Sequence, residues 1–166
     1  MAVRMELSRI FIRELSDMQI IELSEVGGDR TFPIVIGLPE AFAIERRLKG
    51  TEVVRPQTHD LLASAIRSLG GRLTSIEIHD LAQGTFYANL HVEQDGREIV
   101  IDSRPSDAIA LGVAEKVPIY VAEQVLVQAA LEGGSANAPA DEGPEFGTSA
   151  IDFDEGEDDD EDEDTW

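Results

Sequence analysis

The chain of 166 residues contains no cysteine, a single tryptophan and no long uninterrupted apolar run. Without cysteine it can form neither a disulfide nor a cysteine-ligated zinc or iron–sulfur site. No stretch approaches the roughly 18 apolar residues that span a bilayer, and the first residues lack the apolar segment of a secretory signal peptide. We therefore expect a cytoplasmic protein that does not enter a membrane.

Positive charge is also scarce, and its distribution divides the chain. All 13 lysines and arginines lie in residues 1–130, where 19 acidic residues leave a net charge of −6. Residues 131–166 hold 15 acidic residues and no base. The first part is not the basic surface of a general nucleic-acid binder, so any contact with nucleic acid would have to be local or mediated by a metal ion.

The composition places a boundary at about Leu131. From Gly133 the sequence becomes rich in glycine, serine and alanine, which is typical of a flexible linker. From Asp152 to Asp164 nearly every residue is acidic, so that self-repulsion and the lack of apolar residues oppose a packed core. We predict one domain in residues 1–131 and a disordered linker and acidic tail in residues 132–166.

Apolar periodicity and turn signals predict an α+β domain with a mixed β-sheet and about four helices. Strands are predicted at residues 3–12, 18–23, 31–36, 73–78, 85–92, 98–101 and 119–121. Helices are predicted at residues 38–48, 58–69, from 105 onward, and at 123–131, with Thr58 as the N-cap of the second. Strands in runs, only sometimes alternating with helices, favour α+β over a doubly wound sheet.

Two segments carry more polar groups than a turn needs. Each places an Arg-Pro pair before a predicted helix, at residues 55–60 and 101–107. Free N–H groups and the helix dipole favour an anion at such a position. The structural alternative is helix capping, with Arg104 paired to Asp102 or Asp107, and Arg55 paired to Asp60.

The composition of these segments suits hydrolysis of a phosphodiester. Two or three carboxylates can hold Mg²⁺ or Mn²⁺, an arginine can grip a phosphate, and a histidine can carry a proton near neutral pH. A local basic stretch could steer a strand of nucleic acid inward, or could be only a solvated helix end. It consists of Arg46, Arg47, Lys49 and Arg55.

At these segments the sequence resembles the bifunctional nuclease family, a group of small bacterial domains also found in plants. The matching stretches are residues 32–37 with Glu40 and Ala41, then 55–62, 84–88, 101–111 and 118–121. They occur in order over roughly residues 3–130, with the acidic tail outside. The resemblance implies an α+β domain and, for characterised plant relatives, cleavage of both DNA and RNA.

By their chemistry we expect the polar residues of the matching motifs to form the site. The predicted catalytic residues are His59, Asp60, Asp102 and Asp107, with His59 as proton carrier and the three aspartates as ligands of Mg²⁺ or Mn²⁺. The predicted substrate-binding residues are Arg55, Thr58, Arg104 and Ser106.

The leading hypothesis is a metal-assisted nuclease acting on DNA and RNA. The alternative is a non-catalytic domain that binds an anionic ligand or a protein partner. Open sheet edges also make a homo-oligomer plausible.

Overall fold

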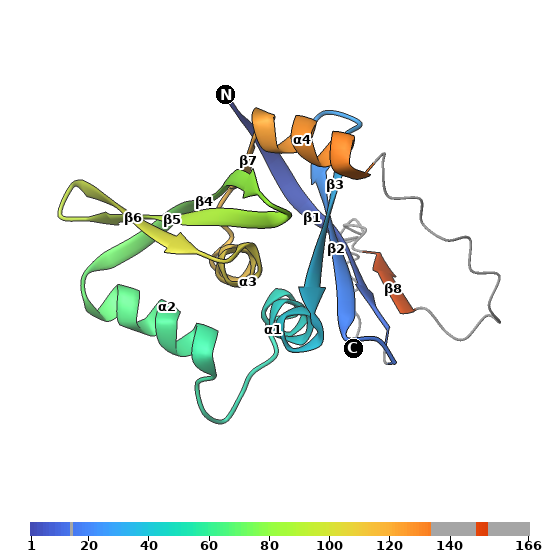
Figure 1. The fold of residues 1–166 in the computed structure, drawn as a ribbon. Helices are drawn as coiled ribbons and strands as arrows, with labels where there is room; N and C mark the ends of the chain where they lie inside the picture. Colours follow the sequence, from blue (N-terminus) through green and yellow to red (C-terminus); the bar gives the residue numbers. More distant parts are fainter. Residues whose placement is uncertain (14, 134–148, 153–166) are drawn as a thin grey trace, which may run out of the picture.

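A computed structural model of the chain describes residues 1–13, 15–133 and 149–152 (Figure 1). Most of the predicted linker and acidic tail, at residues 134–148 and 153–166, lies outside these described residues. Within the described part, no helix is both long enough and apolar enough to cross a membrane.

The predicted mixed sheet is confirmed. Its strands follow the order β3-β2-β1-β7-β4-β5-β6, in which β7 runs parallel to β4 and antiparallel to β1, and the other neighbours are antiparallel. The strands are β1 (Ala2–Ile12), β2 (Met18–Glu25), β3 (Thr31–Gly37), β4 (Gly71–Ala82), β5 (Thr85–Gln94), β6 (Arg97–Ser103) and β7 (Ile119–Ala122). The short strand β7 therefore joins two three-stranded antiparallel parts of the sheet.

One further strand lies within the segment expected to be unstructured. β8 (Ser149–Asp152) pairs antiparallel with Arg9–Ile12, the end of β1 that extends past its pairing with β7. The backbone N–H and C=O groups of such an uncovered strand end are available for pairing. The last helix also continues to Gly133, slightly beyond the predicted boundary at residue 131.

All four predicted helices are present. They are α1 (Leu38–Leu48), α2 (Thr58–Ser68), α3 (Pro105–Glu115) and α4 (Glu123–Gly133). Pro39 and Pro105 stand in the first turns of α1 and α3, where a missing N–H costs no hydrogen bond. The predicted cap of α2 is wrong by one residue, because Gln57 is the N-cap and Thr58 is the first helical residue.

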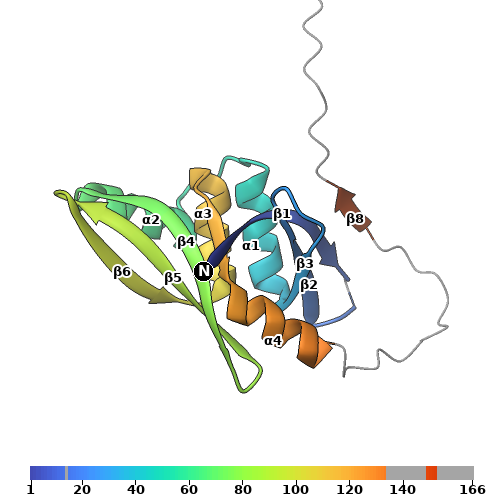
Figure 2. The same ribbon diagram turned by 90° about the horizontal axis from the view of Figure 1, so that it is seen from above.

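The helices differ in how they contact the sheet. In both views α1 and α3 lie side by side between the β1–β3 part and the β4–β6 part of the sheet, and α4 packs on β4 and β7 (Figures 1 and 2). α3 is the most buried helix, with Ile109 and Leu111 fully inaccessible. α2 lies to one side, below β5 and β6 in Figure 1, and its one buried residue is Ala63. The polar residues of interest lie where α1, α2 and α3 meet.

Candidate functional site

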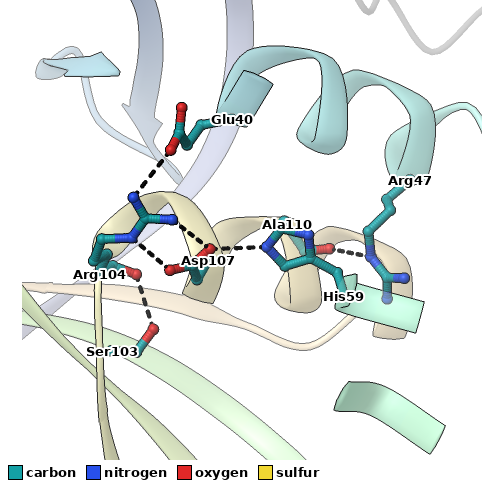
Figure 3. Close-up of polar contacts among 7 residues, drawn as sticks. All are labelled: Glu40, Arg47, His59, Ser103, Arg104, Asp107 and Ala110. Carbon is teal, nitrogen blue, oxygen red and sulfur yellow. Dashed lines mark hydrogen bonds and ion pairs between the residues drawn. The ribbon is translucent and has the colours of Figure 1, made fainter. Parts of the chain in front are cut away.

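The first part of the site is built at the start of α3. Arg104 has an extended backbone just before the helix, and its side chain turns back onto Asp107 in the first turn. Its Nε donates to Asp107 Oδ2 at 2.7 Å and its Nη2 to Oδ1 at 3.1 Å, while Nη1 donates to Glu40 Oε1 of α1 at 2.9 Å (Figure 3). Arg104 thus links α1 to α3 and still keeps 64% of its side chain exposed.

His59 of α2 contacts the same aspartate. Its Nε2 lies 2.9 Å from Asp107 Oδ1, and the imidazole is only 15% exposed (Figure 3). Because an ionised carboxylate only accepts hydrogen bonds, Nε2 carries the hydrogen in this pair, and Nδ1 keeps a lone pair when the ring is neutral. The structure therefore brings together three predicted site residues from two separate motifs: His59, Arg104 and Asp107.

Asp107 is held in its ionised form. Burial would raise the pKa of this carboxyl, but the hydrogen bonds from Arg104 and His59 outweigh burial, and the pKa lies below its ordinary value. The same contact with Asp107, followed by the contact with Glu40, raises the pKa of Arg104. Near neutral pH the site consequently contains a fixed anion, a fixed cation and a histidine bonded to the anion.

Asp60 belongs to a second ionic cluster beside the first. Its carboxylate pairs with Arg46 at 2.9 Å and with Arg47, and accepts the backbone N–H of Gln57 at 3.0 Å. Arg47 is buried and also donates from Nε to the carbonyl oxygen of Ala110 in α3 at 2.7 Å (Figure 3). Burial would raise the pKa of Asp60, but the Gln57 N–H and Arg46 outweigh it and the pKa is lowered. Asp60 therefore fastens α2 to α1.

The remaining predicted residues lie apart from these clusters. Asp102 is exposed on β6 opposite Asn89, whereas its neighbour Ile101 pairs with the buried Leu90, so alternation places Asp102 on the other face of the sheet. Thr58 and Arg55 are exposed, and Arg55 makes no ion pair within the described residues. Of the three capping pairs left open, Arg104–Asp107 is present, whereas Arg104–Asp102 and Arg55–Asp60 are not ion pairs among the described residues.

The three aspartates predicted as metal ligands are held in different surroundings. Across residues 1–13, 15–133 and 149–152, no three histidine, aspartate or glutamate side chains form a group that could hold a metal ion. Two of the three predicted ligands, Asp60 and Asp107, already neutralise arginines, and Asp102 is on the opposite face of the sheet. In this arrangement the three aspartates do not fit a shared metal ion.

A cavity of about 310 Å³ adjoins Arg104. It is bounded by the end of β3, the β4–β5 turn and the start of α3, and its polar lining includes Glu40, Thr85, Arg104 and Ser106. Ser106, a predicted substrate-binding residue, is mostly buried beside it. Sequence reasoning did not place Glu40, Arg47 or Thr85 in the site. Glu40 and Thr85 belonged to motifs that carry the family resemblance, and Arg47 belonged to the basic stretch that could steer nucleic acid.

The fold and the site define a small α+β domain in which a histidine–aspartate pair adjoins an exposed arginine. The profile of the bifunctional nuclease domain matches residues 21–133. An uncharacterized protein of Mycobacterium tuberculosis is 41% identical over 146 residues, covering 88% of this chain and 84% of that protein. The chain belongs to the bifunctional nuclease domain family.

Plant members are more distant. Bifunctional nuclease 1 of rice, Oryza sativa subsp. japonica, is 25% identical over 109 residues, which cover 64% of this chain and 33% of the rice protein. Bifunctional nuclease 2 of the same plant is 27% identical over 100 residues, covering 58% of this chain and 31% of that protein. The chain thus corresponds to about a third of the plant proteins.

Proposed function

We propose that this protein is a nuclease that hydrolyses phosphodiester bonds of DNA and RNA, with His59 and Asp107 in its catalytic site. The observation that carries the proposal is the 2.9 Å contact between His59 Nε2 and Asp107 Oδ1, within two motifs that resemble the nuclease family. The family membership and the rice relatives named as bifunctional nucleases support the same activity.

The chemistry assigned to the pair is general base catalysis. The lone pair on His59 Nδ1 takes a proton from the attacking water as its oxygen bonds to phosphorus, and the Asp107 carboxylate stabilises the resulting imidazolium. The P–O bond to the leaving oxygen then breaks, that oxygen takes up a proton from solvent water, and the imidazolium returns its proton to solvent. Arg104, fixed by Glu40 and Asp107 but largely exposed, supplies positive charge for the phosphate oxygens.

Two further expectations remain proposals. A requirement for Mg²⁺ or Mn²⁺ would call for ligands other than the three predicted aspartates in their present arrangement. Self-association is proposed through β6, an edge strand within the described part of the chain, where Ile99, Val100 and Ile101 are each at least 38% exposed. An exposed apolar edge of this kind favours pairing with another chain.

A non-catalytic domain that binds an anionic ligand or a protein partner is the second candidate. The observation in its favour is that both Asp60 and Asp107 are fully engaged with cations, as expected of structural ion pairs. In this reading the exposed Arg104 holds an anion, and His59 only fixes α2.

Cleavage assays on the full chain distinguish the two. Labelled single-stranded DNA and RNA are incubated with the protein in Mg²⁺, in Mn²⁺ and in EDTA. We expect His59→Ala and Asp107→Asn to lower cleavage roughly 100-fold or more. His79→Ala, which removes a histidine from β4, is the matched control and should cleave like the unaltered chain. Far-UV circular dichroism checks that each variant is folded.

The possible results have separate meanings. Cleavage that survives in both folded variants would remove the histidine–aspartate mechanism. Absence of cleavage by the unaltered chain in every condition, together with retained binding of the same substrates, would support the non-catalytic domain. Activity that depends on the divalent ion would indicate a metal requirement.

A further inference from the structure

A second concave surface lies on the outer side of α1. It has a volume of about 450 Å³ and lies between α1 and the loop that leads to α2, with Phe42, Arg46, Lys49, Thr51 and Gln57 in its lining. This volume is within the range of about 300–1,000 Å³ found for small-molecule sites. We refer to it as the α1 pocket.

The helix periodicity gathers an aromatic ring and two cations on this surface. The face of α1 that packs on the core carries Ala41, Ile44 and Arg47. Phe42, Arg46 and Lys49 follow the spacing i, i+4 and i+7, so they lie along the other side of the helix. Phe42 is consequently 50% exposed, and its ring, with Pro39 and Ala43, forms the apolar part of the pocket lining.

The two cations differ in how firmly they are held. Lys49 pairs at 2.7 Å with Glu45, which is one helical turn away and also lines the pocket, so a bound phosphate would compete with this carboxylate for Lys49. Arg46 is more enclosed: Nη2 donates to Asp60, whereas Nε is buried and has no hydrogen-bond partner among the described residues. Because Arg46 lines the pocket, its guanidinium places positive charge beside an anion bound there, although the buried Nε atom itself is closed to a ligand.

The α1 pocket is linked to the histidine–aspartate pair through two adjacent residues of α2. Arg46 bonds to Asp60, and the preceding residue of α2, His59, bonds to Asp107. Arg55, exposed and without an ion pair in the described ranges, stands in the loop whose residues Thr51 and Gln57 line the pocket. A chain of phosphates crossing the start of α2 would meet both surfaces.

An exposed ring beside cations is the combination that binds single-stranded nucleic acid, because every base has a face that stacks and every nucleotide has a phosphate. We propose that the α1 pocket binds one nucleotide of a single strand of DNA or RNA, with the base stacked on Phe42 and the phosphate held by Lys49 and Arg46. The inference rests on the proposed nuclease function and assigns a substrate subsite to it.

Binding is measured separately from cleavage. The full chain is titrated into labelled oligothymidylate and oligouridylate in EDTA, and binding is followed by fluorescence anisotropy. Phe42→Ala should weaken both affinities roughly 5- to 150-fold, the effect of losing one stacked base. Phe42→Tyr, which keeps an aromatic ring, should bind both oligonucleotides like the unaltered chain. Val127→Ala, which shortens an equally exposed apolar residue on α4, should have no effect. Duplex DNA, whose bases are already stacked, should bind without dependence on Phe42.

A fluorescence variant reports stacking directly. The chain has one tryptophan, Trp166, so Phe42→Trp combined with Trp166→Phe places the only indole in the α1 pocket. Its emission should be quenched as the oligonucleotide binds. Lys49→Gln should weaken binding of both oligonucleotides and reduce the salt dependence of their affinity.

Several results would overturn the proposal. These are unchanged affinity of Phe42→Ala for both oligonucleotides, unchanged emission on binding, or no binding of either oligonucleotide by the unaltered chain. Cleavage is recorded in parallel with Mg²⁺ or Mn²⁺ in place of EDTA. Retained cleavage with binding independent of Phe42 removes only the subsite, whereas binding that depends on Phe42 without cleavage removes only the nuclease function.

Discussion

The two helices that carry the histidine–aspartate pair are attached to the molecule in different ways. α3, which provides Asp107, buries almost all of its residues from Pro105 to Gly112. α2, which provides His59, buries only Ala63, with Ile66 packed at the edge of the core. Half of the candidate site is therefore fixed by apolar packing, and the other half depends mainly on polar contacts.

The polar contacts that attach α2 include those made by residues of the candidate site. α2 is joined to its neighbours by His59–Asp107, by Asp60 with two arginines of α1, and by an exposed pair between Arg67 and Glu115. A substitution at His59 or Asp60 can thus lower activity by releasing α2 as well as by removing a chemical group. The comparison teaches that activity and helix attachment have to be measured together.

The two helices should differ most in the free energy of unfolding that is lost when a leucine of each is replaced by alanine. Leu111→Ala in α3 removes a fully buried side chain and should lower the free energy of unfolding by about 2–5 kcal/mol. Leu61→Ala in α2, at a side chain 62% exposed, should change it by less than about 0.5 kcal/mol. Urea unfolding measures both values. Equal losses would mean that α2 is packed as firmly as α3.

The ionic attachment of α2 can be tested at Asp60. Asp60→Ala leaves the buried Arg47 without its carboxylate partner and should cost about 2–3 kcal/mol, less than breaking a fully buried pair because the Asp60 side chain is 24% exposed. Hydrogen exchange should accelerate chiefly in α2. Glu93→Ala breaks the exposed pair with Arg72 and serves as the control, which should behave like the unaltered chain. Uniform acceleration over the whole domain would contradict a local role.

Acid should release α2 before it unfolds the domain. The pKa values of Asp60 and Asp107 are both below their ordinary values, so each carboxylate stabilises the folded state above the unfolded pKa of about 3.9. This stabilisation is lost as the pH falls through the lowered pKa of each group. Hydrogen exchange of α2 between pH 5 and pH 3 should show faster opening at the acid end. In Asp60→Asn with Asp107→Asn this dependence should become much shallower, and an unchanged dependence would assign it to other carboxylates.

The smallest effect on stability and cleavage is expected at Asp102. This residue belongs to the same sequence motif as Asp107, but the fold places the two side chains apart. Asp102→Asn should leave stability unchanged and alter cleavage by no more than about twofold, because the side chain is exposed and away from His59. Asp107→Asn in the same assay provides the comparison. Loss of cleavage in a folded Asp102→Asn variant would restore the three-aspartate site and show that the described pair is incomplete.

The secondary structure of residues 1–133 was largely predictable because its signals are local. Alternating apolar residues predicted the β4–β5–β6 meander, and Asp95 and Gly96 both have the positive φ angles that their turn requires. Pro39 and Pro105 predicted where α1 and α3 begin. β8 was not predicted, because four residues in an acidic segment become a strand only when an uncovered edge of β1 is available.

For the candidate site, the sequence predicted which residues are available but not which of them pair. The sequence indicated that residues 55–60 and 101–107 are unusually polar, and offered ion pairs within each motif as the simplest structural reading. The Arg104–Asp107 pair follows that reading because the partners are one helical turn apart. Asp60 instead pairs with arginines of α1, and nothing in the spacing of either motif specified that partner.

By itself, the sequence determined the α+β class, the limits of most helices and strands, and the residue types available for chemistry. These properties depend on the period of the apolar pattern and on backbone preferences near each residue. Only the tertiary structure decided that His59 meets Asp107 from 48 residues away and that Arg104 meets Glu40 from 64 residues away. Such contacts are set by how α1, α2 and α3 pack around a common core, and this packing is a property of the whole domain rather than of any motif.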